Sequence, residues 1–377
     1  MDIAILGASG SVGRETATSL VRLGILSKRD QLTLVGRSGG DGARTLHGLR
    51  SELLETYDGS PTIDVAIDPE FVGADLALMC AGRTFSTEIA DVPSRDTLAL
   101  DNVPVFEKYA AILARSRITT GGITLIASNP IELAVDTFRC HLPPERVIGI
   151  GTHLDSLRLR AELAHSLGIS RRRVQVFAGG EHGWGLVPLY STLRVQGWTP
   201  EAAFERCDQI GINFDLAGFR DELALARDDV RDQIRAGRVD GAYETIERCQ
   251  PGIRVCLRPF ITHYSGQKTQ IGVAHAMTDL VDRFVKGDQF VASVQVARPW
   301  PQAGLEHPVA VGRPCLINFS GVASQFDLDL SSPEIHALRY TVEEVRAKLM
   351  SWRGEAVLTG QRGSRQPPCV VVPATRA

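Results

Sequence analysis

Two separated segments carry residues that can move a proton and hold a carboxylate. "GGEHG" places His182 between glycines, and "GTHLDSLRLR" carries Asp155, Arg158 and Arg160 at helical spacing. A neutral imidazole with a carboxylate behind it donates and accepts protons near neutral pH. Arg158 lies three residues after Asp155, hence on the same helix face, where it can grip a carboxylate with two hydrogen bonds. Taken singly, each residue also fits an ordinary structural role, such as a surface salt bridge.

A glycine-rich turn follows the first apolar run, Ile3–Leu6, and precedes a helical pattern. In "GASGSVG", glycines let backbone amides at a helix N-terminus approach a pyrophosphate. A turn without a ligand can have the same spacing, but its position at the first strand–helix junction favours dinucleotide binding. The residues that we assign to the cofactor here are Gly7, Ser9, Gly10, Ser11, Val12 and Gly13.

The end of the second apolar run, Leu32–Val35, bears on the choice of cofactor. NAD-binding sheets usually place Asp or Glu there to bind the ribose hydroxyls. This chain has Gly36, Arg37 and Ser38, and the next acid is Asp41. Arginine and a hydroxyl suit a 2′-phosphate, so we expect NADP to be preferred, with NAD possible. The alternative is that Arg37 is a solvated loop residue.

Short apolar runs alternate with amphipathic stretches over the first 150 residues, which is typical of parallel strands joined by helices. The expected strands are Ile3–Leu6, Leu32–Val35, Leu76–Met79, Leu98–Leu100, Thr124–Ala127 and Val147–Ile150, and expected helices include Arg14–Leu23 and Phe106–Ser116. We therefore expect an α/β protein: a Rossmann doubly wound parallel sheet at residues 1–151, an α+β catalytic domain at 152–356 and a flexible tail at 357–377.

A charged stretch, residues 214–249, interrupts the second half of the chain. Its apolar side chains recur at three- and four-residue steps, which predicts an amphipathic surface helix. These side chains are Phe219, Leu223, Ala226, Val230 and Ile234.

Composition excludes several classes of function. Of 377 residues, 44% are hydrophobic and 23% charged, and a net charge of −3 gives no electrostatic case for nucleic acid or an anionic membrane. No apolar run approaches the roughly 20 residues that span a bilayer, and the N-terminus lacks a signal-peptide pattern. Seven scattered cysteines without a CxxC pair disfavour a disulfide framework or a metal site and fit a reducing cytoplasm.

Together the motifs resemble those of the lactate/malate dehydrogenase family. "GASGSVG", "SNPIEL", "GIGTHLDSLRLR", "GGEHG" and "KTQIGVAHAMTDLV" occur in the family's order over about residues 1–195 and 265–350. The resemblance implies that His182 is the catalytic acid/base, that Asp155 orients it and that Arg158 clamps the substrate carboxylate. Asn129 is similar to the family's asparagine near nicotinamide and substrate, and Thr269 to a small hydroxyl residue beside the substrate. A homodimer or homotetramer is also implied.

The family's active-site lid follows "AG", here Ala81 and Gly82. Seven residues before Asn102 stands Arg95, which resembles the lid arginine that polarises the substrate carbonyl once the lid excludes water. A solvated loop arginine is the alternative for Arg95. The resemblance further implies a cofactor-binding role for Ala81, Gly82, Asn102, Ser128 and Asn129.

Three departures from the family pattern bear on the substrate. The lid is about four residues longer, so the substrate-selecting position falls at Phe85 only if no gap is placed, with Arg83 as the other lid arginine. The segment between His182 and Thr269 is roughly 35 residues longer, an insertion at about 210–250. Trp184 stands where members often have Asp.

The expected reaction is reversible hydride transfer between a nicotinamide cofactor and a 2-hydroxy/2-oxo carboxylate, with malate/oxaloacetate as first candidates. Alternatives are a bulkier or lactate-like 2-hydroxy acid, and a non-catalytic NADP-binding protein of the same fold. Semialdehyde dehydrogenases share the glycine opening, but they need a nucleophilic cysteine near an asparagine. Neither Cys80 nor Cys140 has that setting.

Overall fold

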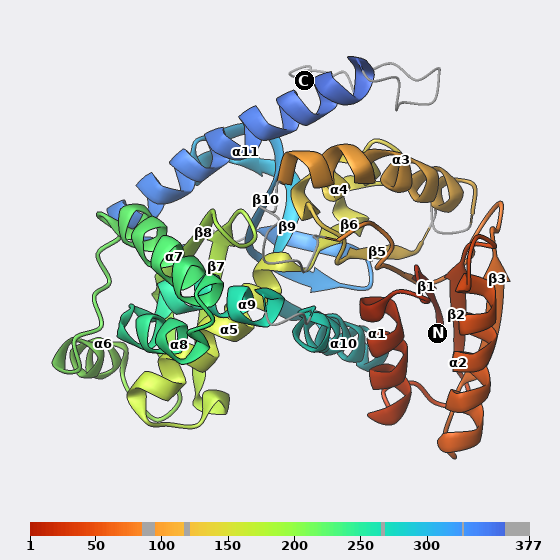
Figure 1. Cartoon of the computed structure of the whole chain (residues 1–377), viewed down its shortest axis with the longest axis horizontal. Coiled ribbons are helices and arrows are strands. Elements are labelled where there is room, and N and C mark those ends of the chain that lie inside the picture. Colours follow the sequence, from red (N-terminus) through yellow and green to blue (C-terminus); the bar gives the residue numbers. More distant parts are fainter. Residues whose placement is uncertain (85–94, 117–120, 265–267, 326–327, 359–377) are drawn as a thin grey trace.

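The computed structural model describes residues 1–84, 95–116, 121–264, 268–325 and 328–358 (Figure 1). Within these ranges the strands are β1 (Asp2–Leu6), β2 (Gln31–Gly36), β3 (Thr62–Ile67), β4 (Leu76–Met79), β5 (Ile123–Ile126), β6 (Val147–Gly149), β7 (Val174–Gly180), β8 (Leu186–Val195), β9 (Phe290–Trp300), β10 (Leu305–Asn318) and β11 (Gly321–Gln325). The α-helices are α1 (Ser11–Arg22), α2 (Gly42–Thr56), α3 (Arg95–Ala114), α4 (Ile131–Phe138), α5 (Gly151–Leu167), α6 (Pro200–Gln209), α7 (Phe219–Arg235), α8 (Val239–Arg248), α9 (Pro251–Tyr264), α10 (Gln270–Lys286) and α11 (Ser332–Leu358).

The first six strands form a parallel sheet in the order β3-β2-β1-β4-β5-β6, the doubly wound order with a switch point between β1 and β4. This confirms the predicted Rossmann sheet. Ligands of such sheets bind at the carboxyl ends of the strands near the switch point. The glycine turn after β1 and the loops after β4 and β5 therefore meet at one edge.

Two details of the predicted sheet were wrong. Leu98–Leu100 is not a strand but part of α3, and the strand that completes the six is β3, Thr62–Ile67. A three-residue apolar run has no periodicity that separates a buried helix from a buried strand. β3 was missed because it lies at the sheet edge and mixes exposed with buried residues.

Alternating residues of the strands belong to two separate hydrophobic clusters, one on each face of the sheet. Ala4 and Leu6 of β1 pack with α3, α4 and α11, whereas Ile3 and Ile5 pack with α1, α2 and α10. Figure 1 shows these two helical layers above and below the sheet. Burial on both faces explains why the strands read as continuous apolar runs.

Antiparallel strands extend the same sheet into the second half of the chain. β9 pairs with β6, β10 with β9, β7 with β10 and β8 with β7, while β11 pairs with β10. Helices α5 to α9 pack beside β7 and β8 around a third hydrophobic cluster. The predicted α+β character of this half is confirmed. The domain boundaries themselves stay a prediction.

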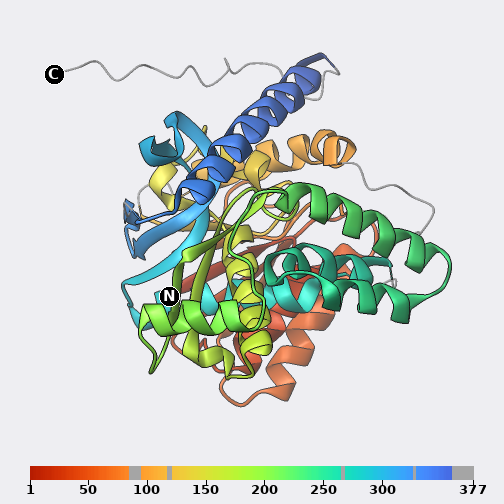
Figure 2. The ribbon, with the colours of Figure 1, turned by 90° about the vertical axis from the view of Figure 1, so that its left-hand side faces the viewer.

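The charged stretch forms α7 and α8, which flank α9 (Figure 2). The predicted amphipathic helix is confirmed as α7, whose buried side chains include Phe219, Leu223, Val230 and Ile234. No helix in the described ranges is long and apolar enough to cross a membrane. Cys140 is disulfide-bonded, which the cysteine spacing did not indicate.

Candidate active site

A histidine–aspartate pair lies at the centre of the candidate site. His182 Nδ1 is 2.8 Å from Asp155 Oδ2, although 27 residues separate them in the chain. Asp155 is 1% exposed and the His182 side chain 13% exposed. The pairing leaves Nε2 of the imidazole as the atom that can exchange a proton with a ligand. The predicted contact between the two residues is therefore confirmed.

Glycines at two chain reversals allow this pair to form. β7 ends at Gly180, and Gly183 in the following turn has φ +86°, a conformation that favours glycine. α5 begins at Gly151, where an added Cβ would lie 2.7 Å from His182 Cβ. The backbone at the start of α5 thus lies directly against the His182 side chain. Any side chain at residue 151 would displace the imidazole.

Opposing influences act on the Asp155 carboxyl. Burial alone would raise its pKa, but the charge and hydrogen bond of His182, together with Arg158, hold the pKa below its ordinary value. The backbone N–H of Gly183 adds a further hydrogen bond at 3.4 Å. Asp155 is therefore an anion at neutral pH, able to stabilise a protonated His182.

Arg158 lies one turn along α5 from Asp155, as the spacing predicts, with Nη1 3.5 Å from Asp155 Oδ1. Burial lowers the pKa of its guanidinium and Asp155 opposes this, but an arginine remains charged. Its side chain is 24% exposed and lines the same cavity as His182. Thr269, at the start of α10, lines that cavity too.

Arg95 begins α3 and points at the histidine turn. Its Nη1 is 2.6 Å from Glu181 Oε1, and its Nη2 donates to the His182 carbonyl at 2.5 Å. Lys348 of α11 holds the same carboxylate, with Nζ 2.9 and 2.8 Å from the two oxygens. Burial would raise the pKa of Glu181, but Arg95 and Lys348 lower it overall. A carboxylate in direct contact thus fixes Arg95 beside His182.

A second buried acid supports the histidine backbone. Glu132 of α4 is 1% exposed, and its Oε1 accepts a hydrogen bond from the His182 backbone N–H at 2.8 Å. Burial and the nearby Glu181 raise the pKa of Glu132. Glu132 therefore contributes position rather than proton transfer.

The glycine turn has the close contacts that its sequence predicts. An added Cβ at Gly7 would lie 2.6 Å from Ala81 Cα, and one at Gly13 would lie 2.5 Å from the Gly7 carbonyl oxygen. Gly10 is less crowded and is an exposed residue at the N-terminus of α1. The free amides at this helix start can receive a pyrophosphate. Ser11 and Val12 line the cavity, and Ser9 is half-buried in the turn.

Asn102 fastens the loop after β4 to the loop after β5. Its Oδ1 accepts from the Arg83 N–H at 2.6 Å, and its Nδ2 donates to the carbonyls of Arg83 and Asn129 at 3.1 and 2.7 Å. Asn102 is fully buried and positions these loops, and its cofactor-binding role stays a prediction.

Four further residues expected near the cofactor also meet at this edge. The Ser128 hydroxyl donates to the Ala81 carbonyl at 2.7 Å. Ser128, Asn129 and Gly82 line the cavity. Arg83 lines it as well, with a side chain that is 73% exposed and an Nε 3.9 Å from Asp101 Oδ2. Phe85 lies outside the described residues.

Asp68, which the local sequence did not indicate, lies beside the end of β2. The backbone N–H and hydroxyl of Ser38 both donate to Asp68 Oδ2 at 2.7 Å, and Lys108 Nζ is 3.2 Å from Asp68 Oδ1. These hydrogen bonds lower the pKa of Asp68 to about 2. Arg37 is exposed beside them. Asp68 follows β3, so only the sheet pairing brings it here.

One cavity of about 510 Å³ connects these groups. It runs from Ser11 and Val12 past Ser128 and Asn129 to His182 and Arg158 and onward to Trp184. A volume of this size suits a small ligand beside part of a cofactor. Part of the predicted cofactor set therefore shares one space with the predicted substrate residues: Ser11, Val12, Gly82, Ser128 and Asn129.

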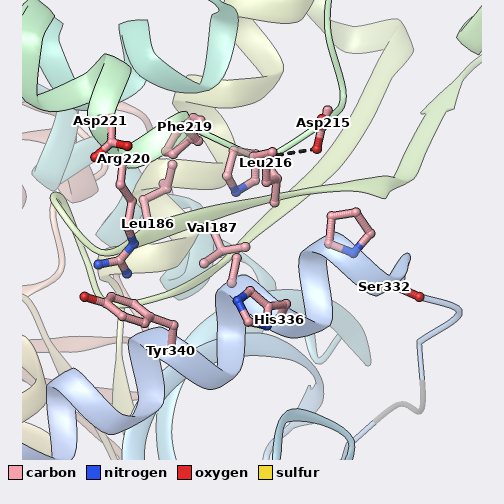
Figure 3. Close-up of a pocket in the computed structure, with 15 residues that line it drawn as sticks. Leu186, Val187, Asp215, Leu216, Phe219, Arg220, Asp221, Ser332, His336 and Tyr340 are labelled. Carbon is pink, nitrogen blue, oxygen red and sulfur yellow. Dashed lines mark hydrogen bonds between the residues drawn. The ribbon is translucent and has the colours of Figure 1, made fainter.

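A larger hollow of about 680 Å³ lies elsewhere, between β8, the start of α7 and α11 (Figure 3). Arg220 lies over the ring of Tyr340, 4.3 Å from its centroid, and His336 faces the hollow from α11. None of the predicted catalytic residues lines it. We therefore place the active site in the smaller cavity.

Sequence reasoning missed several residues that surround the catalytic pair. Glu132 and Glu181 stand inside the quoted motifs "NPIEL" and "GGEHG", so those motifs held a signal for them. No sequence signal indicated Lys348 or the cavity-lining arginines of α7, because only tertiary contacts bring them to the site.

Comparisons with known proteins agree with this geometry. No family model matches the chain. A malate dehydrogenase of Methanosphaera stadtmanae is 29% identical over 202 residues, covering 52% of this chain and 60% of that protein. An L-lactate dehydrogenase of Limosilactobacillus reuteri is 27% identical, covering 91% and 92%. An L-2-hydroxycarboxylate dehydrogenase (NAD(P)⁺) of Methanocaldococcus jannaschii is 26% identical, covering 92% and 97%.

The fold is shared with solved structures. The lactate dehydrogenase of Eimeria maxima, solved with NADH and oxamate, matches with a TM-score of 0.72 at 18% identity, covering 97% of each chain. The sequence similarity extends over most of the chain, and the fold is the same. The chain is therefore similar to lactate and malate dehydrogenases, which are oxidoreductases that act on CH–OH groups, and the predicted resemblance to that family is supported.

Proposed function

We propose that the protein reversibly reduces a 2-oxo acid to a 2-hydroxy acid with a nicotinamide cofactor. Oxaloacetate and malate are the first candidate pair. The observation that carries the proposal is the 2.8 Å contact between His182 and Asp155 in a cavity that begins at the glycine turn. A bound nicotinamide supplies or accepts the hydride in this chemistry.

His182 is the proton donor for reduction and the acceptor for oxidation. Asp155 lies at Nδ1, so Nε2 presents its proton to the substrate oxygen. As that proton leaves or arrives, the imidazole changes charge, and the buried Asp155 anion stabilises the charged form. Asp155 keeps its role because its lowered pKa prevents it from taking the proton itself.

Arg158 holds the carboxylate of the substrate, and Arg95 polarises the carbonyl that is reduced. Asp155 offsets the charge of Arg158 through only one long contact of 3.5 Å, which leaves its guanidinium able to bind an incoming anion. Glu181 and the His182 carbonyl hold Arg95 close to the imidazole. Asn129, Thr269 and Arg83 are the proposed neighbours of the bound substrate.

NADP is the proposed cofactor. Arg37 is exposed at the end of β2, where it can receive a 2′-phosphate, and the relative from M. jannaschii is named for both cofactors. Asp68 weakens this preference, because its negative charge lies at the Ser38 hydroxyl. Lys108 partly offsets that charge. The test is the ratio of kcat/KM for NADPH and NADH, and a higher value for NADH would contradict the proposal.

The mechanism predicts a loss of turnover in H182A. Without the proton donor, kcat should fall by roughly 10²- to 10⁴-fold, while NADPH affinity measured by nicotinamide fluorescence stays close to wild type. His165, exposed near the end of α5, offers the matched control H165A, which should retain activity.

Two results would contradict the proposed function. Undiminished turnover in H182A would remove His182 from the chemistry. A wild-type protein that binds NADPH but reduces no 2-oxo acid in a broad panel would instead be a non-catalytic binding protein. We also propose a cytoplasmic homodimer or homotetramer, and light scattering of the purified protein tests the assembly.

A further inference from the structure

Helix α7 places a stripe of arginines on the wall of the active-site cavity. Arg227, Arg231 and Arg235 are spaced by four residues, so they follow one face of the helix. All three line the same cavity as His182 and Arg158. The neighbouring face carries Val230 and Ile234 and is buried, so packing fixes the direction of the stripe.

The ion pairs of this stripe leave it positively charged. Arg227 Nε lies 3.1 Å from Asp228, and Arg231 Nη1 lies 3.3 Å from the same carboxylate. That carboxylate is 47% exposed, so solvent screens its attraction. Arg231 also lies 3.6 Å from Asp232, which is 67% exposed. Exchanging such solvated partners for an anion inside the cavity costs little.

Two aromatic rings line the cavity beside the stripe. The Arg227 guanidinium lies over the Trp184 ring, 5.3 Å from its centroid. The Phe260 ring meets Trp184 edge-on at 4.6 Å between centroids. Both rings line the cavity together with Pro259. The space between His182 and the arginines therefore suits an apolar segment of a ligand.

The arginine stripe and Arg158 reach the cavity from different helices. Arg158 belongs to α5, the stripe belongs to α7, and α9 packs against both helices. A four-carbon diacid has its carboxylates only two carbons apart. A longer ligand can place one anionic group at Arg158 and a second at the α7 stripe.

The charge of the cavity exceeds what the proposed reaction uses. Six arginines and Lys268 line it, and its described lining contains no Asp or Glu. One carboxylate occupies Arg158, and Arg95 serves the carbonyl. Arg83 is the proposed substrate neighbour beside them. Lys268 and the three arginines of α7 remain, and those arginines lie in a segment that the catalytic motifs do not include.

We propose that the α7 arginines bind a second anionic group at the far end of the substrate. This inference rests on the proposed function and names its substrate class: a 2-oxo acid longer than oxaloacetate, with an apolar spacer and a distal carboxylate or phosphoryl group. Trp184 and Phe260 contact the spacer. The reacting end is held by Arg158 as before.

The test compares 2-oxo acids that differ only at the far end. The probes are 2-oxoadipate, its distal phosphonate analogue and 2-oxohexanoate, which has the same carbon chain without the distal charge. Wild type should prefer the charged probes by kcat/KM. In R231M/R235M that preference should fall by roughly 10- to 100-fold, the loss expected when charged hydrogen bonds are removed. The control R248M removes one charge from an exposed position on α8 and should keep the preference.

Each outcome has a separate meaning. A larger loss for the phosphonate than for 2-oxoadipate identifies a phosphoryl group, and the reverse identifies a carboxylate. A preference that survives in R231M/R235M, or falls equally in R248M, overturns this inference alone. If wild type reduces oxaloacetate but none of the longer probes, the inference fails and the proposed function stands. If wild type reduces none of these acids, the proposed function fails as well.

Discussion

At the scale of single residues, the catalytic pair depends on a position without a side chain as well as on the two reacting groups. Gly151 has no side chain, and this allows the His182 ring to approach the start of α5. Gln295 Nε2 would be 2.8 Å from a Cβ at residue 151, so two neighbours would have to move. Neither is the free end of a flexible surface chain.

We expect G151A to impair catalysis without unfolding the protein. Alanine favours a helix more than glycine does, so stability should change little, but His182 must shift. A displacement of about 1 Å in a catalytic group can cost roughly 100-fold in rate, so kcat should fall more than tenfold at nearly unchanged NADPH affinity.

Gly48 in α2 offers the control, because a Cβ there would meet nothing within 4 Å. G48A should retain full activity, and thermal unfolding of both variants checks their stability. Wild-type kcat in G151A would show that His182 does not need its observed position.

Residue spacing predicted the contacts that short segments encode, and missed the others. Asp155 and His182 were paired correctly because each lies in a dense motif with a clear chemical meaning. The contacts of Glu181 with Arg95 and Lys348 span 86 and 167 residues, and a single sequence contains nothing that relates such positions. Asp68 beside Ser38 was missed for the same reason.

At the scale of elements, periodicity worked where an element was long or repeated. The α7 helix was predicted because its apolar side chains recur over more than four turns. "LAL" at residues 98–100 was misassigned because three apolar residues fit either a strand or a buried helix. Helix α3 contains Pro104, and this further obscured its helical pattern.

The helix that carries Asp155 and Arg158 is fixed to α10 by a pH-sensitive contact. His153 Nε2 of α5 lies 2.9 Å from Asp279 Oδ2 of α10. Burial would raise the pKa of Asp279, but the hydrogen bond and charge of His153, with Arg283, lower it to about 2. Because this pKa lies below the unfolded value, the contact stabilises the fold above about pH 4 and weakens as the pH falls toward 2.

D279N should therefore lower the free energy of unfolding by ~2 kcal/mol at about pH 5. The difference from wild type should shrink between about pH 4 and about pH 3, since the Asp279 carboxylate of the unfolded wild-type chain takes up a proton there while that of the folded protein stays ionised. Urea unfolding at each pH measures it. A difference that is constant or grows toward pH 3 would show that the Asp279 pKa is not depressed. D282N, on the exposed side of α10 beside Lys286, is the matched control.

At the scale of the whole molecule, the sheet and α11 join both halves of the chain. β6 of the parallel part pairs with β9 of the antiparallel part. α11 packs against α3 and α4 and also against β7, β8 and β10, as its diagonal path in Figure 2 shows. Its Trp352 Nε1 donates to Asp96 Oδ1 at 2.6 Å. The predicted domains at 1–151 and 152–356 thus share a sheet and a covering helix.

We expect the two halves to unfold together, because separating them would break the sheet and expose the apolar face of α11. The four tryptophans all lie after residue 152, so their fluorescence reports the second half. Cys80, a free thiol whose pKa burial raises to about 12, reports the first half through its protection from labelling. In urea the two probes should give the same midpoint without cofactor, and saturating NADPH should shift the fluorescence midpoint upward, since the cofactor binds only the folded form. Labelling of Cys80 at a clearly lower urea concentration than the fluorescence change would show that the halves are independent units, and that the shared sheet does not couple them.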